Sequence, residues 1–445
     1  MTGIGDRFTP MTVRSFLRAT SSRRCVIAAG AGAAVATAFP SGTDASAAAN
    51  GTSRRTGTWA SVPTAVPESD VGVVQDRTLR QVVRTSIAGD AVQVRLTNEF
   101  GDRPLVVGEV HVALRTGAGT DILPSTDRVV TFGGATGVTI PAGTPVVSDP
   151  VALSLAPASD LVVSLYLPER TTITTVHGFA FQENVVAPGN VTGARTVTAT
   201  ATFWEWYFLS GVSVRTRSSD AAAIVTLGDS ITDGAQTQNN ADHRWPDLLA
   251  QRLRAAPGFP ERGVLNLGIS GNRLLHDPNP PLGSAAEGFA ALFGQSALRR
   301  FDRDVVAQPG VRFAIVLLGV NDIGHPGTDA VSSEAVTAAD IIGGYRQLIA
   351  RAHQAGIAIF GGTVTAFKDD AFGFYSPANE LIRQEVNRWI RSSGEYDGVV
   401  DFDLATRDPA DPLRLHPSYD SGDHLHPNDA GAAAMAAAVP LGFFR

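Results

Sequence analysis

The chain has 445 residues, which is enough for two or three domains that each bury a core. Hydrophobic residues make up 44% of it and charged residues 18%, as in ordinary soluble globular proteins. The formal net charge of -7 excludes an overall basic field of the kind that attracts nucleic acid or anionic membranes.

Residues 1–47 have the three parts of an export signal. Basic residues ending in the pair Arg23-Arg24 precede an apolar run from Cys25 to Phe39, and the small residues Ala45-Ser46-Ala47 follow. The run is too short to span a membrane comfortably, so we expect a cleaved signal peptide and a secreted protein without stable membrane insertion. A retained N-terminal anchor is the alternative. The arginine pair favours the twin-arginine route over the general one. Cys25 is the only cysteine, so the mature chain is expected to have no disulfides.

From residue 48 to residue 218 the chain is rich in Val, Thr, Gly and Pro and has the pattern of β-strands. Apolar residues occupy every second position of Ala91–Asn98, the period of a half-buried strand, and Leu161–Leu167 is a more continuous apolar strand. Turn residues such as Pro188-Gly189-Asn190 separate the strands, and few segments have helical spacing. This pattern predicts an all-β sandwich or jelly-roll domain over 48–218.

Residues 219–445 alternate short apolar strands with helical stretches. Strands are expected at 222–227, 264–267, 313–318, 357–360 and 399–402, with helices at 245–255, ahead of residue 306, and at 338–355, 379–391 and 429–438. This alternation predicts an α/β domain with a parallel sheet that is covered on both faces. Ligands bind such sheets at the carboxyl ends of the strands, so we expect the functional residues there.

Three of these strands end in residues that can carry chemistry. Ser230 lies in the run Gly-Asp-Ser-Ile-Thr-Asp-Gly at 228–234, where glycines permit a tight turn and close approach of a substrate. By itself this run also fits a residue that merely caps a helix. Gly271 and Asn321 follow the next two strands. A backbone N–H at Gly271 and the amide of Asn321 could donate to a developing oxyanion, although Gly and Asn are also common turn residues.

A fourth block lies near the C-terminus, in the run Asp-His-Leu-His-Pro at 423–427. Asp423 lies three positions before His426 and can hold the tautomer of its imidazole and stabilise the imidazolium. The alternative is a metal site formed by His424, His426 and Asp423. No other His or Cys cluster supports it, so neither a metal nor another cofactor is expected.

The four blocks, in this order and within one α/β domain, resemble the SGNH (GDSL-type) hydrolase family, whose name lists Ser, Gly, Asn and His. The matches are Gly-Asp-Ser-Ile-Thr around Ser230, Gly271, Gly-Val-Asn-Asp around Asn321, and Asp-x-x-His-Pro from Asp423, and they cover about 222–445. The resemblance implies a flavodoxin-like three-layer αβα sandwich with a five-stranded parallel sheet. A G-x-S-x-G elbow is missing from the sequence and the Asp is close to the His, which argues against the α/β-hydrolase fold.

The resemblance also implies a role for each residue. Ser230 would attack an ester carbonyl, His426 would act as general base and then general acid, and Asp423 would orient it. The oxyanion hole would combine the backbone N–H groups of Ser230 and Gly271 with the side chain of Asn321. Asp229 would brace the turn.

A closer resemblance is to a bacterial SGNH subgroup likened to xylan-degradation esterases, whose members carry a β-rich region ahead of the catalytic domain. It rests on residues 244–250, 300–305 and 321–324, and on 98–105 in the β-rich region. The subgroup also includes lysophospholipase-like proteins, so the substrate does not follow from this resemblance. Export and an accessory β domain fit a polymeric substrate outside the cell, so we expect a secreted ester hydrolase that removes short acyl groups, such as acetyl, from polysaccharide or small esters.

Two alternatives remain open. A lipid esterase or lysophospholipase would need an apolar channel for the acyl chain, which Phe289 and Phe293 could line. A carbohydrate-binding protein with weak esterase activity could stack sugars on Trp204, Trp206 and Tyr207, although aromatic residues in strands are more often core residues.

Overall fold

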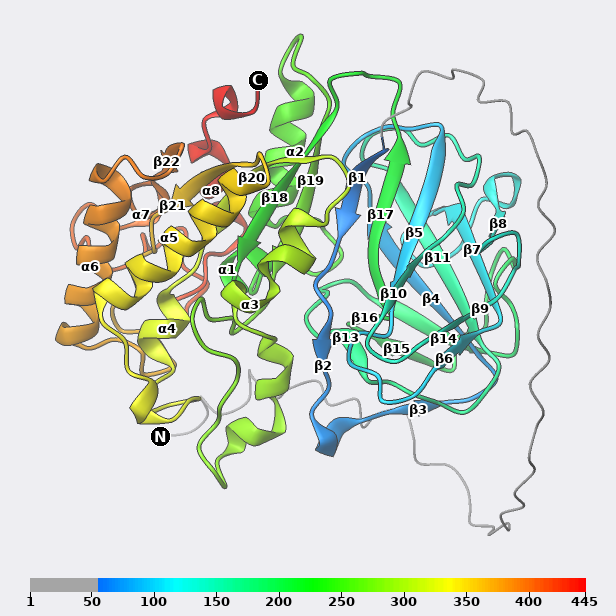
Figure 1. The fold of residues 1–445 in the computed structure, drawn as a ribbon, viewed down its shortest axis with the longest axis horizontal. Helices are drawn as coiled ribbons and strands as arrows, with labels where there is room; N and C mark the ends of the chain where they lie inside the picture. Colours follow the sequence, from blue (N-terminus) through cyan, green and yellow to red (C-terminus); the bar gives the residue numbers. More distant parts are fainter. Residues whose placement is uncertain (1–54) are drawn as a thin grey trace.

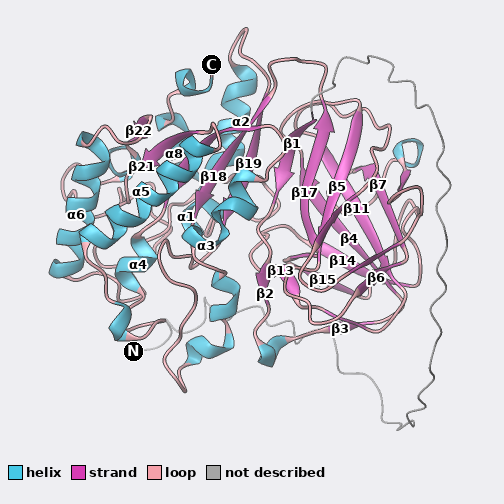
Figure 2. Ribbon diagram, in the orientation of Figure 1, coloured by secondary structure: helices cyan, strands magenta, loops and turns pink. Residues whose placement is uncertain are grey.

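The computed structural model describes residues 55–445; the predicted export signal lies outside these residues. An all-β region comes first and an α/β region follows it, as Figures 1 and 2 show. The predicted α/β fold with a preceding all-β region is therefore confirmed. Among the described residues, no helix is both long enough and apolar enough to cross a membrane.

The all-β region is built from two antiparallel sheets that share one core. The first has the strand order β1-β17-β5-β10 and the second β15-β14-β4-β11-β7-β8. Alternate residues of β5, namely Val92, Val94 and Leu96, point into the core that the second sheet also lines, as expected of a sandwich. The strands of the two sheets are β1 (Arg55–Ala60), β4 (Arg77–Arg84), β5 (Ala91–Thr97), β7 (Glu109–Leu114), β8 (Arg128–Val130), β10 (Pro145–Val147), β11 (Asp160–Leu167), β14 (Asn184–Pro188), β15 (Ala201–Phe203) and β17 (Leu209–Arg215).

Short strands complete this region. They pair in three small sheets: β2 (Thr64–Ala65) and β16 (Trp206–Tyr207) with β13 (Thr175–His177), β3 (Val73–Val74) with β12 (Thr171–Thr172), and β6 (Leu105–Val107) with β9 (Val138–Ile140). Trp206 and Tyr207 are each only 4% exposed and belong to the core. These two rings are therefore covered by protein and closed to a sugar, whereas Trp204, the third residue suggested for a sugar-stacking platform, is partly exposed.

The α/β region has one five-stranded sheet in which every pairing is parallel, with the order β19-β18-β20-β21-β22. This is the flavodoxin-like order. Its strands are β18 (Ala222–Gly228), β19 (Arg262–Gly268), β20 (Val311–Leu317), β21 (Ala358–Gly362) and β22 (Gly398–Val400). They are mostly buried, as in a sheet covered on both sides.

Two groups of helices cover the sheet. Helix α8 contacts α2 and α7 in one group, and α5 contacts α3 and α6 in the other. The helices are α1 (Ser230–Asp233), α2 (Trp245–Ala255), α3 (Ala297–Phe301), α4 (Val320–Gly324), α5 (Ala338–Gln354), α6 (Pro377–Ser392), α7 (Phe402–Thr406) and α8 (Asp429–Ala438). The long predicted helices agree with these bounds to within two residues. The strand predicted over 399–402 is shorter, because Phe402 already begins α7.

Strand β1 lies between the two regions, beside both β17 and β19 (Figure 1). A Cβ on Gly263 would lie 2.0 Å from the carbonyl oxygen of Gly57, so the backbones of β19 and β1 are in close contact. Ala60 and Val62 are part of the core of the α/β region. The two regions therefore share a buried interface.

Candidate active site

Ser230 lies at the junction of β18 and α1, at the carboxyl edge of the parallel sheet. Asp229 precedes it in extended conformation and caps α1, since its Oδ1 accepts the N–H of Ile231 at 3.0 Å. Burial raises the pKa of Asp229 to about 7, against the opposing effect of that hydrogen bond. Asp229 thus caps the short helix that begins at Ser230. Ser230 itself is largely buried, with 6% of the residue exposed.

His426 reaches Ser230 from a loop 196 residues further along the chain. The His426 Nε2 lies 2.8 Å from the Ser230 Oγ, and its Nδ1 lies 2.8 Å from the Asp423 Oδ2. The three predicted side chains therefore form one hydrogen-bonded chain at the sheet edge. Such a chain lets the imidazole take the serine proton while the carboxylate stabilises the resulting cation.

The surroundings of Asp423 keep it ionised. Burial acts to raise its pKa, but the hydrogen bonds and charge of His426, with the N–H of Leu425, outweigh it and lower the pKa to about 2. Its Oδ1 accepts the backbone N–H groups of Leu425 at 3.0 Å and of His426 at 2.8 Å. A carboxylate at the Nδ1 side fixes a hydrogen on that nitrogen, so Nε2 is free to accept the serine proton.

Gly271 and Asn321 lie on the segments that follow the two strands flanking β18. The pairing of β18 with β19 brings Gly228 beside Gly268, and Gly271 follows in the left-handed region with φ 77°. Within the described residues, the backbone N–H groups of Ser230 and Gly271 donate to no protein acceptor. The Asn321 Nδ2 donates to the carbonyl of Asn272 at 2.9 Å, which ties α4 to the turn that carries Gly271. The second hydrogen of this amide is available for another acceptor.

Arg300 holds the ends of β18 and β19 together, a role that we did not assign from the sequence. Its guanidinium is fully buried and donates to the carbonyls of Gly228 at 3.2 Å and Leu267 at 3.1 Å, and to the Asn272 side chain at 3.0 and 3.1 Å. Burial lowers the pKa of Arg300 to about 10, so it remains cationic at neutral pH. The only available signal was its place in the 300–305 block.

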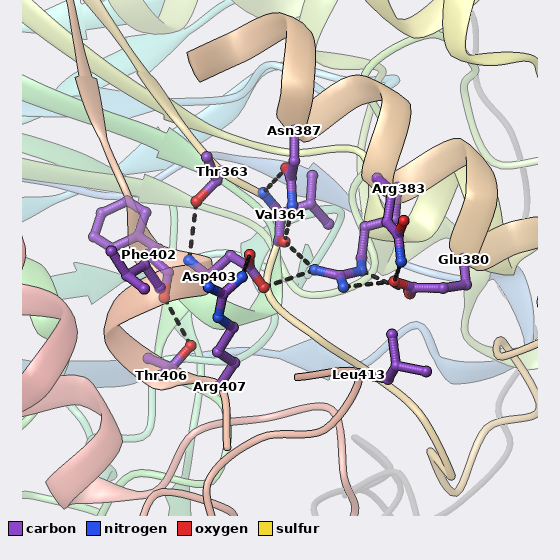
Figure 3. Close-up of polar contacts among 12 residues, drawn as sticks. Thr363, Val364, Glu380, Arg383, Asn387, Phe402, Asp403, Thr406, Arg407 and Leu413 are labelled. Atoms are coloured by element: carbon purple, nitrogen blue, oxygen red, sulfur yellow. Dashed lines mark hydrogen bonds and ion pairs between the residues drawn. The ribbon is translucent and has the colours of Figure 1, made fainter. Parts of the chain in front are cut away.

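The segment between β21 and α6 is anchored by a buried ionic cluster, drawn in Figure 3. Arg383 of α6 binds Glu380 at 2.7 Å, Asp403 of α7 at 2.8 Å and the carbonyl of Val364 at 3.1 Å. The same segment continues to Phe372, whose ring stands edge-on to the His426 ring at 5.6 Å. The cluster therefore fixes the start of a loop that forms one wall beside His426.

A shallow hollow with about 0 Å³ of space for a water molecule lies beside Gly271. Polar and aromatic side chains both line it, including Arg273, His276, Asn279, Phe293 and His325. Phe293 packs against Gly271, where a Cβ would lie 2.1 Å from its ring, and against His325 at 5.2 Å. Burial, aided by Arg273, lowers the pKa of His325 to about 3, so this ring is neutral.

The geometry does not favour the alternative of a metal at 423–427. Both ring nitrogens of His426 already face Asp423 and Ser230, and His424 pairs with Asp420 instead. Within residues 55–445, no group of three or more His, Cys, Asp or Glu side chains could hold a metal ion.

A serine hydroxyl, an imidazole and a carboxylate in this order, next to free backbone N–H groups, define a serine hydrolase. Residues 226–434 match the GDSL-like lipase/acylhydrolase family, and this part of the chain belongs to that family. The protein is thus a serine hydrolase of ester bonds.

Similar solved structures include three hydrolases. Axe2, an acetylxylan esterase from Geobacillus stearothermophilus, is 18% identical, with 50% of this chain and 94% of that chain covered and a TM-score of 0.35. LAE5, an alpha/beta hydrolase enzyme from the metagenome of Lake Arreo, is 20% identical, with 49% of this chain and 92% of that chain covered and a TM-score of 0.35. A GDSL-like lipase from Bacteroides thetaiotaomicron is 18% identical, with 48% of this chain and 84% of that chain covered and a TM-score of 0.32. The comparison with curated proteins gave no match.

Proposed function

We propose that the protein is a secreted carboxylic-ester hydrolase that removes short acyl groups, with Ser230, His426 and Asp423 as its catalytic residues. The observation that carries the proposal is the continuous hydrogen-bonded chain from Asp423 through His426 to the Ser230 hydroxyl, with both links at 2.8 Å. Apposition at this distance gives the nucleophile a base without any further rearrangement.

The reaction proceeds in two steps. Ser230 Oγ attacks the ester carbonyl carbon while His426 Nε2 takes its proton, and the same proton then goes to the departing alcohol as the C–O bond breaks. Water, activated by His426, attacks the acyl-enzyme and releases the carboxylic acid and the free Ser230 hydroxyl. The oxyanion of both tetrahedral intermediates is bound by the N–H groups of Ser230 and Gly271 and the amide of Asn321. One such donor is worth roughly 3–4 kcal/mol in the transition state.

We infer a short acyl group because aromatic and polar side chains crowd the surroundings of Gly271, the proposed oxyanion donor. Phe289 and Phe293 pack against each other with ring centroids 5.5 Å apart, and Phe293 also covers Gly271. Charged or polar residues such as Arg273 and Asn279 lie in the same surroundings, which would disfavour a long apolar chain there. A lipid esterase is the competing assignment, and acetyl esters of polysaccharide or small alcohols are the proposed substrates.

Secretion rests on the sequence of residues 1–47, which lie outside the described part of the chain. In the full-length protein, replacement of Arg23 and Arg24 with Lys should block the twin-arginine route. We then expect the esterase activity in the cytoplasm instead of the medium or periplasm. Export that survives this change would point to the general route.

The decisive experiment compares the wild type with Ser230→Ala on acetylated xylan, on lysophosphatidylcholine and on nitrophenyl esters of increasing chain length. We expect acetate release and a preference for acetate and propionate esters, both lost in Ser230→Ala by a factor of about 10³ or more while the thermal unfolding curve is retained. A fluorophosphonate should label Ser230 in the wild type alone. A long-chain optimum would replace the proposal with a lipid esterase, and an active Ser230→Ala would reject it.

A further inference from the structure

A buried ion pair joins the all-β region to the end of helix α1. His177, the last residue of β13, places its Nε2 3.0 Å from the Oδ1 of Asp233, the last residue of α1. The two side chains are only 4% and 3% exposed. The pair lies one helical turn beyond Ser230, and no role followed from the sequence for either residue.

The hydrogen bonds of His177 fix where its protons lie. Its Nδ1 faces the carbonyl oxygen of Val62 at 3.0 Å, and since a carbonyl can only accept, Nδ1 carries a hydrogen. The Nε2 faces a carboxylate, so a further proton is held between Nε2 and Asp233. The ring also packs against Trp206 at 5.5 Å, which restricts its rotation. The contact is therefore a charge-assisted hydrogen bond in a fixed geometry, shielded from water.

The other oxygen of Asp233 holds the turn that carries the oxyanion donor. Asp233 Oδ2 accepts the backbone N–H of Ser270 at 2.9 Å and the Ser270 hydroxyl at 2.8 Å. The next residue is Gly271, whose N–H has no protein acceptor among the described residues. One carboxylate thus connects His177, the nucleophile helix and the Ser270–Gly271 turn.

The same edge of the all-β region also supports the opposite side of that turn. Leu292 packs against the core of the all-β region and lies where a Cβ on Gly178 would meet it at 3.1 Å. The neighbouring Phe293 covers Gly271, and Thr64 of β2 lies at 3.1 Å from the Cβ position of Gly294. Thr64 of β2 and Gly178, which directly follows β13, therefore lie against the segment 292–294 that contains Phe293.

We propose that His177 is a positioning residue of the ester hydrolase: through Asp233 it holds the Ser270–Gly271 turn so that the Gly271 N–H points at the oxyanion. The inference rests on the proposed function. It makes the all-β region a part of the active-site framework, because an oxyanion hole stabilises the transition state only when its donors are fixed before the reaction. Loss of the bond from His177 would leave a buried carboxylate with one fewer donor, and the turn would relax around it.

Two amide substitutions separate this role from a merely structural one. In His177→Gln the amide nitrogen can take the place of Nε2 and still donate to Asp233, whereas in His177→Asn it can take the place of Nδ1 and donate only to Val62. We expect His177→Gln to keep kcat within about 3-fold, and His177→Asn to lose about 10- to 100-fold in kcat with little change in KM, since the loss falls on the transition state. The affinity for a phosphonate transition-state analogue should fall with kcat.

His111→Gln is the matched control. His111 of β7 also lies between two carboxylates, Asp127 at 2.9 Å and Glu109 at 2.8 Å, but both belong to the all-β region. It should lower the thermal stability without changing kcat or the affinity for the phosphonate.

The outcomes are distinct. Wild-type kcat and analogue affinity in His177→Asn would overturn the inference, and equal losses in both His177 variants would assign His177 a structural role only. If His177→Asn does not fold, Ser270→Ala takes its place: it removes one donor to Asp233, and an unchanged kcat and analogue affinity would again overturn the inference. A wild-type protein that hydrolyses no ester and is not labelled at Ser230 would instead reject the proposed function.

Discussion

Asp423 shows how a few hydrogen bonds set the chemical state of a single residue. Four N–H groups point at its carboxylate: the ring Nδ1–H of His426, the backbone N–H groups of Leu425 and His426, and, at 3.4 Å, the side-chain amide of Gln236. The groups of His426 and Leu425 outweigh the effect of burial and hold the pKa near 2. The folded-state pKa lies below the ordinary value, so this group stabilises the fold above about pH 4, and that contribution is lost as the pH falls toward 2.

The substitution Asp423→Asn tests the orienting role. The amide keeps the size of the side chain, but an NH₂ group can face Nδ1, which favours the tautomer with the hydrogen on Nε2, the wrong one for a base. We expect kcat to fall by about 10³- to 10⁴-fold near neutral pH, as in serine hydrolases with this change. Initial rates on nitrophenyl acetate measure it. A variant that keeps more than a tenth of the wild-type kcat would show that His426 does not depend on Asp423.

At the scale of elements, the nucleophile depends on how closely α1 packs against β19. A Cβ on Gly268 would lie 2.3 Å from the backbone nitrogen of Asp233 and 2.7 Å from its Cα. These are backbone atoms of α1, so no side-chain rotation can relieve the contact. The turn that carries Ser230 is thus set by a glycine on the neighbouring strand.

Gly268→Ala is therefore expected to shift α1 and to separate Ser230 from His426. We predict a loss of about 1–3 kcal/mol in the free energy of unfolding, as for other overpacked sites, together with a fall in kcat of at least about 10-fold. Gly343→Ala is the control, because this helical glycine of α5 has open space around its Cβ position and alanine favours helix by up to about 1 kcal/mol. Urea unfolding and ester hydrolysis measure both; a Gly268→Ala protein with normal kcat would contradict the argument.

The length of a helix or strand decides whether the sequence could predict it. Long helices and buried strands repeat a hydrophobic period over several turns or residues, so α2, α5 and α6 could be predicted almost to the residue. Helices α1, α4 and α7 have only four or five residues, too few for any period, and each starts within two or three residues of a strand end. That is why Phe402 was wrongly placed in a strand.

Some residues of the site could likewise be predicted from the sequence, and others could not. Ser230, Asp423 and His426 lie in short motifs at strand ends or near the C-terminus, and the motifs could be read directly. His177 and Arg300 act through contacts with residues far away in the sequence, such as Asp233 and Gly228. Such partners follow from the packing of one region on another, which a single sequence does not contain.

For the whole molecule, the interface between the two regions makes cooperative unfolding the expected behaviour. Backbone groups cross it, as in the hydrogen bond from Gly57 N–H to the carbonyl of Pro309 at 2.8 Å. Side chains cross it as well: Ser86 accepts the N–H of Val264 at 3.0 Å, and Glu99 pairs with Arg303 at 3.2 Å. Ala60 and Val62 are also buried in the core of the α/β region, so the two regions are expected to unfold together.

Glu205 offers a test of that cooperativity, because its effect on stability depends on pH. This residue of the all-β region is 8% exposed; burial raises its pKa to about 7, although hydrogen bonds from the Trp204 N–H and the Tyr207 hydroxyl act in the other direction. The folded state therefore keeps a proton that the unfolded state releases near pH 4.5. Between these values the folded state binds more protons, so the contribution of Glu205 falls as the pH rises and is at its lowest above about pH 7.

Glu205→Gln removes the loss of stability that Glu205 causes as the pH rises, because the amide is neutral at every pH. At pH 8 we expect the variant to be more stable than the wild type by on the order of 3 kcal/mol, since each tenfold difference in proton affinity between the folded and unfolded states is equivalent to about 1.4 kcal/mol. At pH 4.5 the two proteins should differ little. Calorimetry at both pH values measures the difference in stability between the two proteins. Asp229 and Asp247 are also buried carboxyls whose pKa is raised to about 7. Because both proteins contain them, their effects cancel and the difference reports on Glu205 alone.

The activity of the heated protein then reports on the α/β region, which contains no part of the substitution. If the two regions unfold together, the temperature at which esterase activity is lost at pH 8 should rise in Glu205→Gln by the same few degrees as the calorimetric Tm. Two calorimetric transitions, with only the first shifted and the temperature of activity loss unchanged, would show that the regions unfold separately. In that case the interface could not transmit stability to the site, and the support that His177 gives to the oxyanion turn would be local to β13 and α1.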